Sequence, residues 1–139
     1  MPTPAFSLPS FAKINWNLRI LGRRPDGYHE VRTFLQTISL QDQLHFESRD
    51  DDDISLACDN PNIPTDETNL IVRAANSLRS RYGVKSGASI ALNKRIPAKG
   101  GLGGASSNAA IALMGLIRLW RLELNSSDLV DIAAGLGAD

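Results

Sequence analysis

The sequence holds a single cysteine, Cys58, and no excess of either charge, since fifteen lysines and arginines are matched by fifteen aspartates and glutamates. One cysteine cannot form an internal disulfide, which favours a reducing, cytoplasmic setting. A net charge of zero argues against nucleic acid or an anionic membrane as the partner. No apolar run approaches the about 20 residues of a membrane-spanning helix, and residues 1–12 lack a secretory signal pattern. The composition therefore favours a soluble, cytoplasmic protein.

Apolar residues make up 42% of the 139 residues, which is enough for one domain with its own core. Apolar and polar residues alternate over residues 12–20, the period of a half-buried strand. After a turn at residues 22–27, we expect strands at 28–40 and 44–48, joined by the polar residues 41–43, and a short strand at 54–57.

The pattern then changes to the period of a helix. One apolar stripe runs over residues 70–82, with Asp66 or Thr68 as the expected N-cap and Gly83 as the expected residue after the C-terminus. A strand at 88–93, a buried helix at 105–120 and a last helix opened by residues 126–128 follow. Because the strands come first and the helices cluster late, the expected fold class is α+β, a mixed sheet packed with helices.

The glycine-rich segment at residues 95–110 is the most informative part of the chain. Its glycines allow tight turns and the close approach of a ligand to the backbone. The helix expected after them offers unpaired N–H groups and the positive end of its dipole, while Ser106 and Ser107 add hydroxyls for phosphate oxygens or a metal ion. The segment lacks both the Gly-Lys-Ser/Thr of a Walker A loop and the G-x-G-x-x-G fingerprint. By itself it leaves two alternatives open, a phosphate site and a tight turn into a buried helix.

Four segments, at residues 11–15, 24–29, 69–75 and 97–110, resemble in sequence and order the GHMP kinases, a superfamily of small-molecule kinases. Within it the chain most resembles the family that phosphorylates 4-diphosphocytidyl-2-C-methyl-D-erythritol in the non-mevalonate isoprenoid (terpenoid) pathway, because residues 101–107 read Gly-Leu-Gly-Gly-Ala-Ser-Ser. The resemblance implies a ribosomal protein S5 domain 2-like fold and transfer of phosphate from ATP to the 2-hydroxyl of this cytidine diphosphate-linked substrate. Residues 136–139 resemble the start of the family's catalytic Asp segment. We therefore expect residues 1–139 to be the N-terminal ATP-binding domain of a longer protein, inactive without its C-terminal domain.

The resemblance also implies roles for five residues outside the glycine loop. Asp139 is the expected catalytic base for the acceptor hydroxyl, and Lys13 is expected to hold Asp139 ionised or to stabilise the transferring charge. Asn15 lies on the same strand face as Lys13 and is expected to position the substrate. Tyr28 and His29 are expected to contact the cytosine by stacking and hydrogen bonding. Judged from spacing alone, Lys13 is more typical of a surface residue and Tyr28 of an ordinary strand residue.

For the nucleotide, the resemblance places the phosphates on the glycine loop and the adenine near Asn69, Leu70 and Lys94. Lys99 faces either phosphate or solvent, and Asn108 either contacts the nucleotide or caps the helix. The full expected ATP-binding set is Pro97, Ala98, Lys99, Gly100, Gly101, Leu102, Gly103, Gly104, Ala105, Ser106, Ser107, Asn108, Asn69, Leu70 and Lys94. Mg²⁺ is expected to arrive with ATP, held mostly by phosphates and water.

Two other features are given no functional role. The acidic run at residues 50–53 is expected to be a solvated loop, because adjacent carboxylates in a turn converge poorly on one ion, and His45 lies in a strand without a supporting motif. Two alternatives to the leading hypothesis stay open. One is another GHMP kinase of the mevalonate, homoserine or sugar type, and the other is a non-catalytic S5-like RNA-binding module, which the neutral charge opposes.

Overall fold

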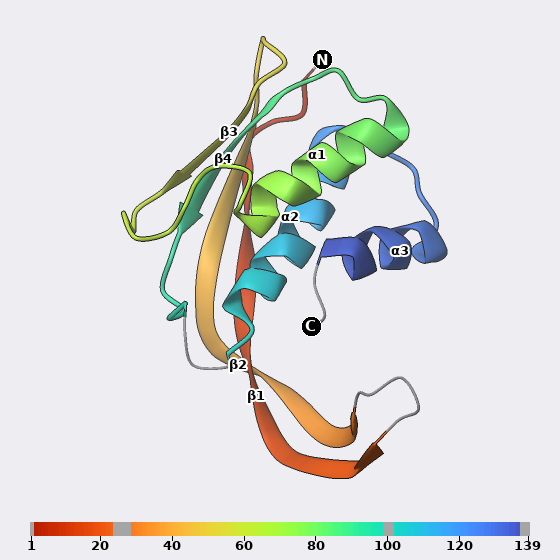
Figure 1. Ribbon diagram of the computed structural model, residues 1–139. Helices are drawn as coiled ribbons and strands as arrows, with labels where there is room; N and C mark the ends of the chain where they lie inside the picture. Colours follow the sequence, from red (N-terminus) through yellow and green to blue (C-terminus); the bar gives the residue numbers. More distant parts are fainter. Residues whose placement is uncertain (1, 24–28, 99–101, 137–139) are drawn as a thin grey trace.

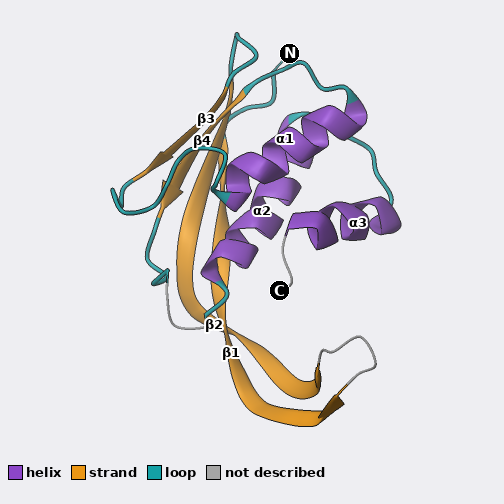
Figure 2. Cartoon of the chain, viewed as in Figure 1, coloured by secondary structure: helices purple, strands orange, loops and turns teal. Residues whose placement is uncertain are grey.

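A computed structural model of the chain describes residues 2–23, 29–98 and 102–136, with the backbone alone for residues 14–23 and 29–35. Strands and helices make up most of this part (Figures 1 and 2). In chain order they are β1 (Phe6–Arg23), β2 (His29–Ser48), β3 (Ile54–Cys58), α1 (Leu70–Tyr82), β4 (Ala88–Asn93), α2 (Gly104–Leu119) and α3 (Ser126–Leu136).

The strands form one mixed sheet in the order β1-β2-β4-β3. The pairs β1–β2 and β2–β4 are antiparallel, and β3–β4 is parallel. The helices cover one face, where α2 packs on β1 and β2, α1 contacts β3, and α3 packs on α1 and α2 (Figure 1). This arrangement confirms the expected α+β class, a mixed sheet packed with helices. Within the described ranges, every helix is too short or too polar to span a bilayer.

The prediction of a break between two strands at residues 41–43 is wrong, because β2 runs without interruption from His29 to Ser48. Gln41 and Gln43 pair with β1 opposite Phe11 and Pro9, so the ladder continues through the polar segment. Register shifts in the β1–β2 pair lie between residues 11 and 13, 15 and 18, and 20 and 22. Such irregularities bend a strand, and the far end of this long hairpin curves away from the rest of the sheet (Figure 2).

The core lies between the sheet and the helices. It is built from β2, β4, α1 and α2, and its fully buried large side chains include Leu44, Phe46, Leu78, Ile90 and Leu116. The helix α2 lies so close to the sheet that a Cβ on Gly115 would stand 2.2 Å from Cζ of Phe46. Lys94 and Ile96, which follow β4, contact the first residue of α2, since a Cβ on Gly104 would lie 2.9 Å from Nζ of Lys94 and 3.0 Å from Cγ2 of Ile96.

The start of α1 differs from the expectation, since its N-cap is Asn69 rather than Asp66 or Thr68. The Asn69 Oδ1 accepts a hydrogen bond from the N–H of Ile71 at 2.8 Å. Asp66 instead accepts bonds from the N–H and the hydroxyl of Thr68, and so closes the turn that precedes the cap. The other end of the helix is as expected, with Gly83 in the left-handed conformation at φ 65°.

Candidate functional site

The exit of the glycine loop lies against β1. Gly103 has φ 70° and is the N-cap of α2, without a side-chain capping bond. A Cβ at this position would lie 2.8 Å from Cε of Lys13, and the N–H of Lys13 donates to the carbonyl of Leu102 at 2.9 Å. Glycine is therefore favoured at 103 both by its backbone conformation and by the space that the Lys13 side chain occupies. Because Gly103 has no side chain to cap the helix, the start of α2 is suited to an anionic group.

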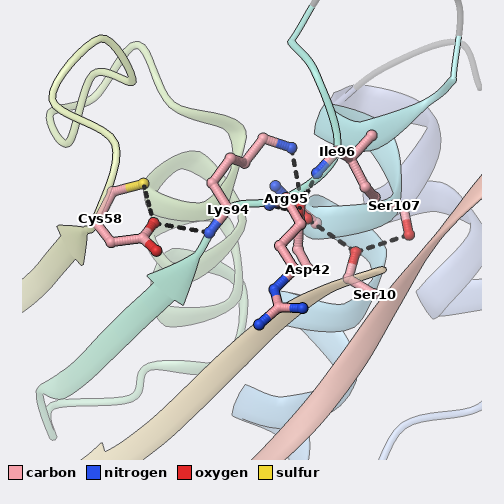
Figure 3. A network of polar contacts seen from close by, with 9 residues as sticks. Ser10, Asp42, Cys58, Lys94, Arg95, Ile96 and Ser107 are labelled. Atoms are coloured by element: carbon pink, nitrogen blue, oxygen red, sulfur yellow. Dashed lines mark hydrogen bonds and ion pairs between the residues drawn. The ribbon is translucent and has the colours of Figure 1, made fainter. Parts of the chain in front are cut away.

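The chain that enters the loop is anchored by a buried carboxylate, Asp42 of β2 (Figure 3). Its Oδ2 accepts a bond from Nζ of Lys94 at 2.6 Å, and its Oδ1 accepts from the N–H groups of Arg95 and Ile96 at 2.5 and 2.7 Å. The side chain of Asp42 is 0% exposed and that of Lys94 is 6% exposed. Because both charges are out of water, each depends on the other for compensation.

A second group of polar contacts joins β1 to the start of α2. The hydroxyl of Ser10 lies 2.8 Å from that of Ser107 and 2.8 Å from the side-chain amide of Asn108. With Nδ2 turned inward, Asn108 also donates to the carbonyl of Gly104 at 3.2 Å and to Oδ2 of Asp42 at 3.0 Å. That orientation is favoured, since in the other one the amide oxygen faces only acceptors and the amide nitrogen only donors. The two groups of contacts thus form one network.

Beside this network is a cavity of about 200 Å³. It is lined by Ile63, Pro64, Thr68, Asn69, Leu70, Lys94, Ala98, Ala105 and Asn108. The fold therefore brings together six residues of the expected ATP-binding set from three separate segments. Of the two roles expected of Asn108, that of helix cap is wrong, because the N-cap of α2 is Gly103. Ser106 lines a second, smaller cavity of about 50 Å³.

The side-chain amide of Asn69 holds two parts of the cavity wall together. Its Nδ2 donates to the carbonyl of Pro64 at 2.8 Å while its Oδ1 caps α1. Lys94 is held from two sides, since its N–H donates to Asp59 at 2.8 Å and its ammonium group to Asp42. Whether either residue contacts adenine stays a prediction.

Several expected site residues lie outside the described part of the chain. Tyr28, Lys99, Gly100, Gly101 and Asp139 are in the ranges that the structure does not describe, and the backbone alone is described for Asn15 and His29. The backbone of Asn15 pairs with Leu35 of β2, and that of His29 with Arg23 of β1. The roles expected of these seven residues therefore stay predictions.

Sequence reasoning missed Asp42 and Ser10, together with three residues of the cavity wall. A signal for Asp42 was present, because it precedes Leu44 and Phe46 at intervals of two residues and so shares their face of the strand. Both of these apolar residues are fully buried. A carboxylate in register with buried side chains needs a compensating partner, and Lys94 is that partner.

The features without an expected role are accounted for by local contacts. The acidic run is exposed, as expected, and Asp51 accepts bonds from Nε and Nη2 of Arg49 at 2.7 and 2.8 Å. The hydrogen bonds from this guanidinium lower the pKa of Asp51 to about 2. His45 lies between Ser7 and Glu47, with contacts of 2.9 and 3.0 Å. Among the described residues, no group of three or more histidine, cysteine or acidic side chains is arranged to hold a metal ion.

Two curated relatives of this chain carry the same name. The 4-diphosphocytidyl-2-C-methyl-D-erythritol kinase of Pseudomonas syringae pv. syringae is 47% identical over 139 residues, which are 100% of this chain and 49% of that protein. The kinase of the same name from Burkholderia thailandensis is 48% identical over 128 residues, 92% of this chain and 43% of that protein. The chain thus spans about half the length of the curated relatives it matches.

Solved structures agree with the sequence relatives. A crystal structure of 4-(cytidine 5′-diphospho)-2C-methyl-D-erythritol kinase matches with a TM-score of 0.81 and 37% identity, over 96% of this chain and 47% of that one. A mevalonate kinase matches with a TM-score of 0.73 at 13% identity, which shows a shared fold alone. Residues 69–139 match the family described as GHMP kinases N terminal domain. With this match over the segment that holds α1, the glycine loop and α2, the chain belongs to the GHMP kinase family.

Proposed function

We propose that the protein containing this chain is an ATP-dependent kinase that phosphorylates the 2-hydroxyl of 4-diphosphocytidyl-2-C-methyl-D-erythritol, in the non-mevalonate isoprenoid pathway. The observation that carries the proposal is the 47% identity, over the whole of this chain, to a relative of that name. The glycine loop, the free start of α2 and the adjoining cavity supply a site of matching chemistry.

The nucleotide is proposed to lie along the cavity, with its phosphates at the start of α2. The N-cap Gly103 lacks a side-chain bond, so the first N–H groups of the helix are directed at whatever occupies this position. A helix start of this kind stabilises negative charge through its N–H groups and its dipole. The adenosine would then occupy the cavity between Asn69 and Lys94, about 200 Å³ in volume.

Mg²⁺, which would neutralise charge on the phosphates as they rearrange, is proposed to bind chiefly through phosphate oxygens and water. This agrees with the usual chemistry of Mg²⁺ at nucleotide sites, where substrate phosphates and water supply most of the ligands and the protein supplies one or two. Of the two loop serines, Ser107 contacts Ser10 at 2.8 Å. Ser106 is therefore the better candidate for a ligand to a phosphate-bound cation.

For the transfer step, Asp139 is proposed to accept the proton of the 2-hydroxyl, and Lys13 to stabilise the charge that develops on the reacting oxygens. A base within hydrogen-bonding reach contributes about 10²- to 10⁴-fold to such reactions. Lys13 lies directly against Gly103, which supports a place for its ammonium group beside the phosphates. Asn15, Tyr28 and His29 are proposed to position the methylerythritol and cytosine ends of the substrate.

The test is a phosphoryl-transfer assay on the complete gene product that carries this sequence, beside its Asp139→Asn variant. We expect transfer from ATP to the cytidine substrate by the first protein, and loss of most turnover with nearly unchanged ATP affinity in the second. Methylerythritol without the cytidine diphosphate is the matched control substrate. If it is accepted equally well, the enzyme is a GHMP kinase of another specificity.

A further inference from the structure

We propose that Asp42 is a positioning residue that holds both ends of the glycine loop in the geometry that the nucleotide requires. The proposal rests on the proposed function, because it concerns the same site. Asp42 does not line the cavity itself. It acts through residues that do, from a buried position on β2 beneath them (Figure 3).

The chain entering the loop is held by three consecutive residues that donate to this one carboxylate. Lys94 donates through its ammonium group, whereas Arg95 and Ile96 donate through their backbone N–H groups. An ionised carboxylate offers about four acceptor positions, so one side chain can accept all of these bonds. The direction in which the backbone leaves β4 is set by these contacts, because two successive N–H groups must face the same oxygen.

The chain leaving the loop reaches the same carboxylate through α2. Asn108, which is 4% exposed, donates from Nδ2 to Oδ2 of Asp42 at 3.0 Å, and the hydroxyl of Ser10 lies 2.8 Å from the same nitrogen. At the first residue of the helix, a Cβ on Gly104 would lie 2.9 Å from Nζ of Lys94. The ammonium group that Asp42 holds is therefore packed directly under the start of α2. Lys94, Arg95 and Ile96, before the loop, and Asn108, after it, therefore share this single anchor.

The cavity wall links Asp42 to the nucleotide. Lys94 and Asn108 both line the cavity, and both are held in place by Asp42. Without the carboxylate charge, the Lys94 ammonium group would be a buried cation lacking compensation, and it would move toward water in the cavity. The ATP site would change shape, while Asn15 on β1 and His29 on β2, both proposed to bind the cytidine substrate, would keep their places in the sheet. If Asp42 only stabilised the fold, its loss would impair the ATP site and the cytidine-substrate site alike.

The test compares the complete gene product with its Asp42→Asn variant, which keeps the volume of the side chain and removes its charge. Two readouts are taken, hydrogen exchange at the N–H groups of Arg95 and Ile96, and the KM values for ATP and for the cytidine substrate. Asp52→Asn, in the exposed acidic run, is the charge-matched control. Leu116→Ala, in the buried second half of α2, is the control for lost stability.

We expect Asp42→Asn to reduce protection at both N–H groups, because the bonds to them are no longer bonds to a charged oxygen. The ATP KM should rise about tenfold, since the amide nitrogen cannot accept the bonds from Lys94 and Asn108 that the second carboxylate oxygen accepts. The KM for the cytidine substrate should change by less than about twofold, and neither control should show the split. An unchanged ATP KM in folded Asp42→Asn, or an equal rise in Leu116→Ala, would overturn the proposal.

The variant can fail to fold, or the unaltered protein can lack ATP binding. If Asp42→Asn does not fold, Ser10→Ala is tested in its place, because it removes the hydroxyl that holds Asn108 and leaves the buried ion pair intact. A smaller rise confined to the ATP KM supports the proposal, and an unchanged ATP KM overturns it. If the unaltered protein neither binds nor uses ATP, the proposed function fails. The positioning role of Asp42 is then tested by hydrogen exchange alone. Reduced protection of the Arg95 and Ile96 N–H groups in Asp42→Asn supports this role, and unchanged protection contradicts it.

Discussion

Replacing Gly103 by alanine probes the contact between the glycine loop and Lys13. Two costs can be estimated from the structure. Alanine at φ 70° loses about 1–2 kcal/mol for the left-handed conformation. The new methyl carbon would stand 2.8 Å from Cε and 3.0 Å from Cγ of Lys13, so that side chain must leave its rotamer, at about 0.5–1.5 kcal/mol. The expected total is about 1.5–3.5 kcal/mol.

The chain contains a matched control in Gly83, the residue after α1. It has φ 65°, and a Cβ at this position would meet no atom within 4 Å beyond its own chain neighbours. Gly83→Ala therefore carries the backbone cost of about 1–2 kcal/mol without the contact. The difference between the two variants isolates the displacement of Lys13.

The assay is urea unfolding of both variants together with turnover of the complete gene product. We expect Gly83→Ala to keep normal turnover at reduced stability. Gly103→Ala should unfold more easily still and lose turnover by up to about 100-fold, because a displacement of about 1 Å at a reacting group can have that effect. Equal destabilisation of the two variants, with turnover unaffected in both, would refute the view that Lys13 is fixed against the loop.

Three further predictions concern separate parts of the chain. Asn69→Ala removes both the α1 cap and the bond to Pro64. In a urea titration it should lower the free energy of unfolding by about 1 kcal/mol. The control Asn76→Ala, on the exposed side of α1, should have little effect in the same titration. Because the folded pKa of Asp51 is lowered from 3.8 to about 2, its pairing with Arg49 stabilises the fold above pH 3.8 and is lost as the pH falls through about 2. Carboxyl NMR titration should give that value and show it rising toward 3.8 in Arg49→Gln; an unchanged value would exclude the guanidinium as the cause. The 139-residue chain alone should show no phosphoryl transfer, and robust turnover by it would contradict the expectation that it is inactive without a C-terminal domain.

Features that depend on neighbours in the sequence could be predicted from it. The apolar stripe over residues 70–82 matches α1, and Gly83 ends that helix because a residue without Cβ accepts φ 65° without strain. The strand at 88–93 matches β4. The four family segments pointed to a GHMP kinase, and the family match confirms that membership.

Features that depend on distant partners could not be predicted in the same way. Asp66 and Thr68 were plausible caps for α1, but they bond to each other, and the position of Pro64 lets Asn69 take the role. The segment at residues 41–43 is polar enough for a loop. It stays in β2 because its neighbouring strands complete the ladder and because residues 94–96, more than fifty positions away, satisfy the carboxylate of Asp42.

The sequence by itself thus determined the fold class and the residues of the glycine loop, because periodicity and turn chemistry are local properties of the chain. The family followed from the resemblance of four of its segments to known kinases. Only the tertiary structure decided how the loop is held. Compensation of a buried charge depends on which groups the fold places within hydrogen-bonding distance, and Lys94 reaches Asp42 only once β4 lies beside β2. The packing of α1 against α2 likewise brings Asn69, Leu70 and Asn108 to one cavity, although Asn108 is far from the other two in the sequence.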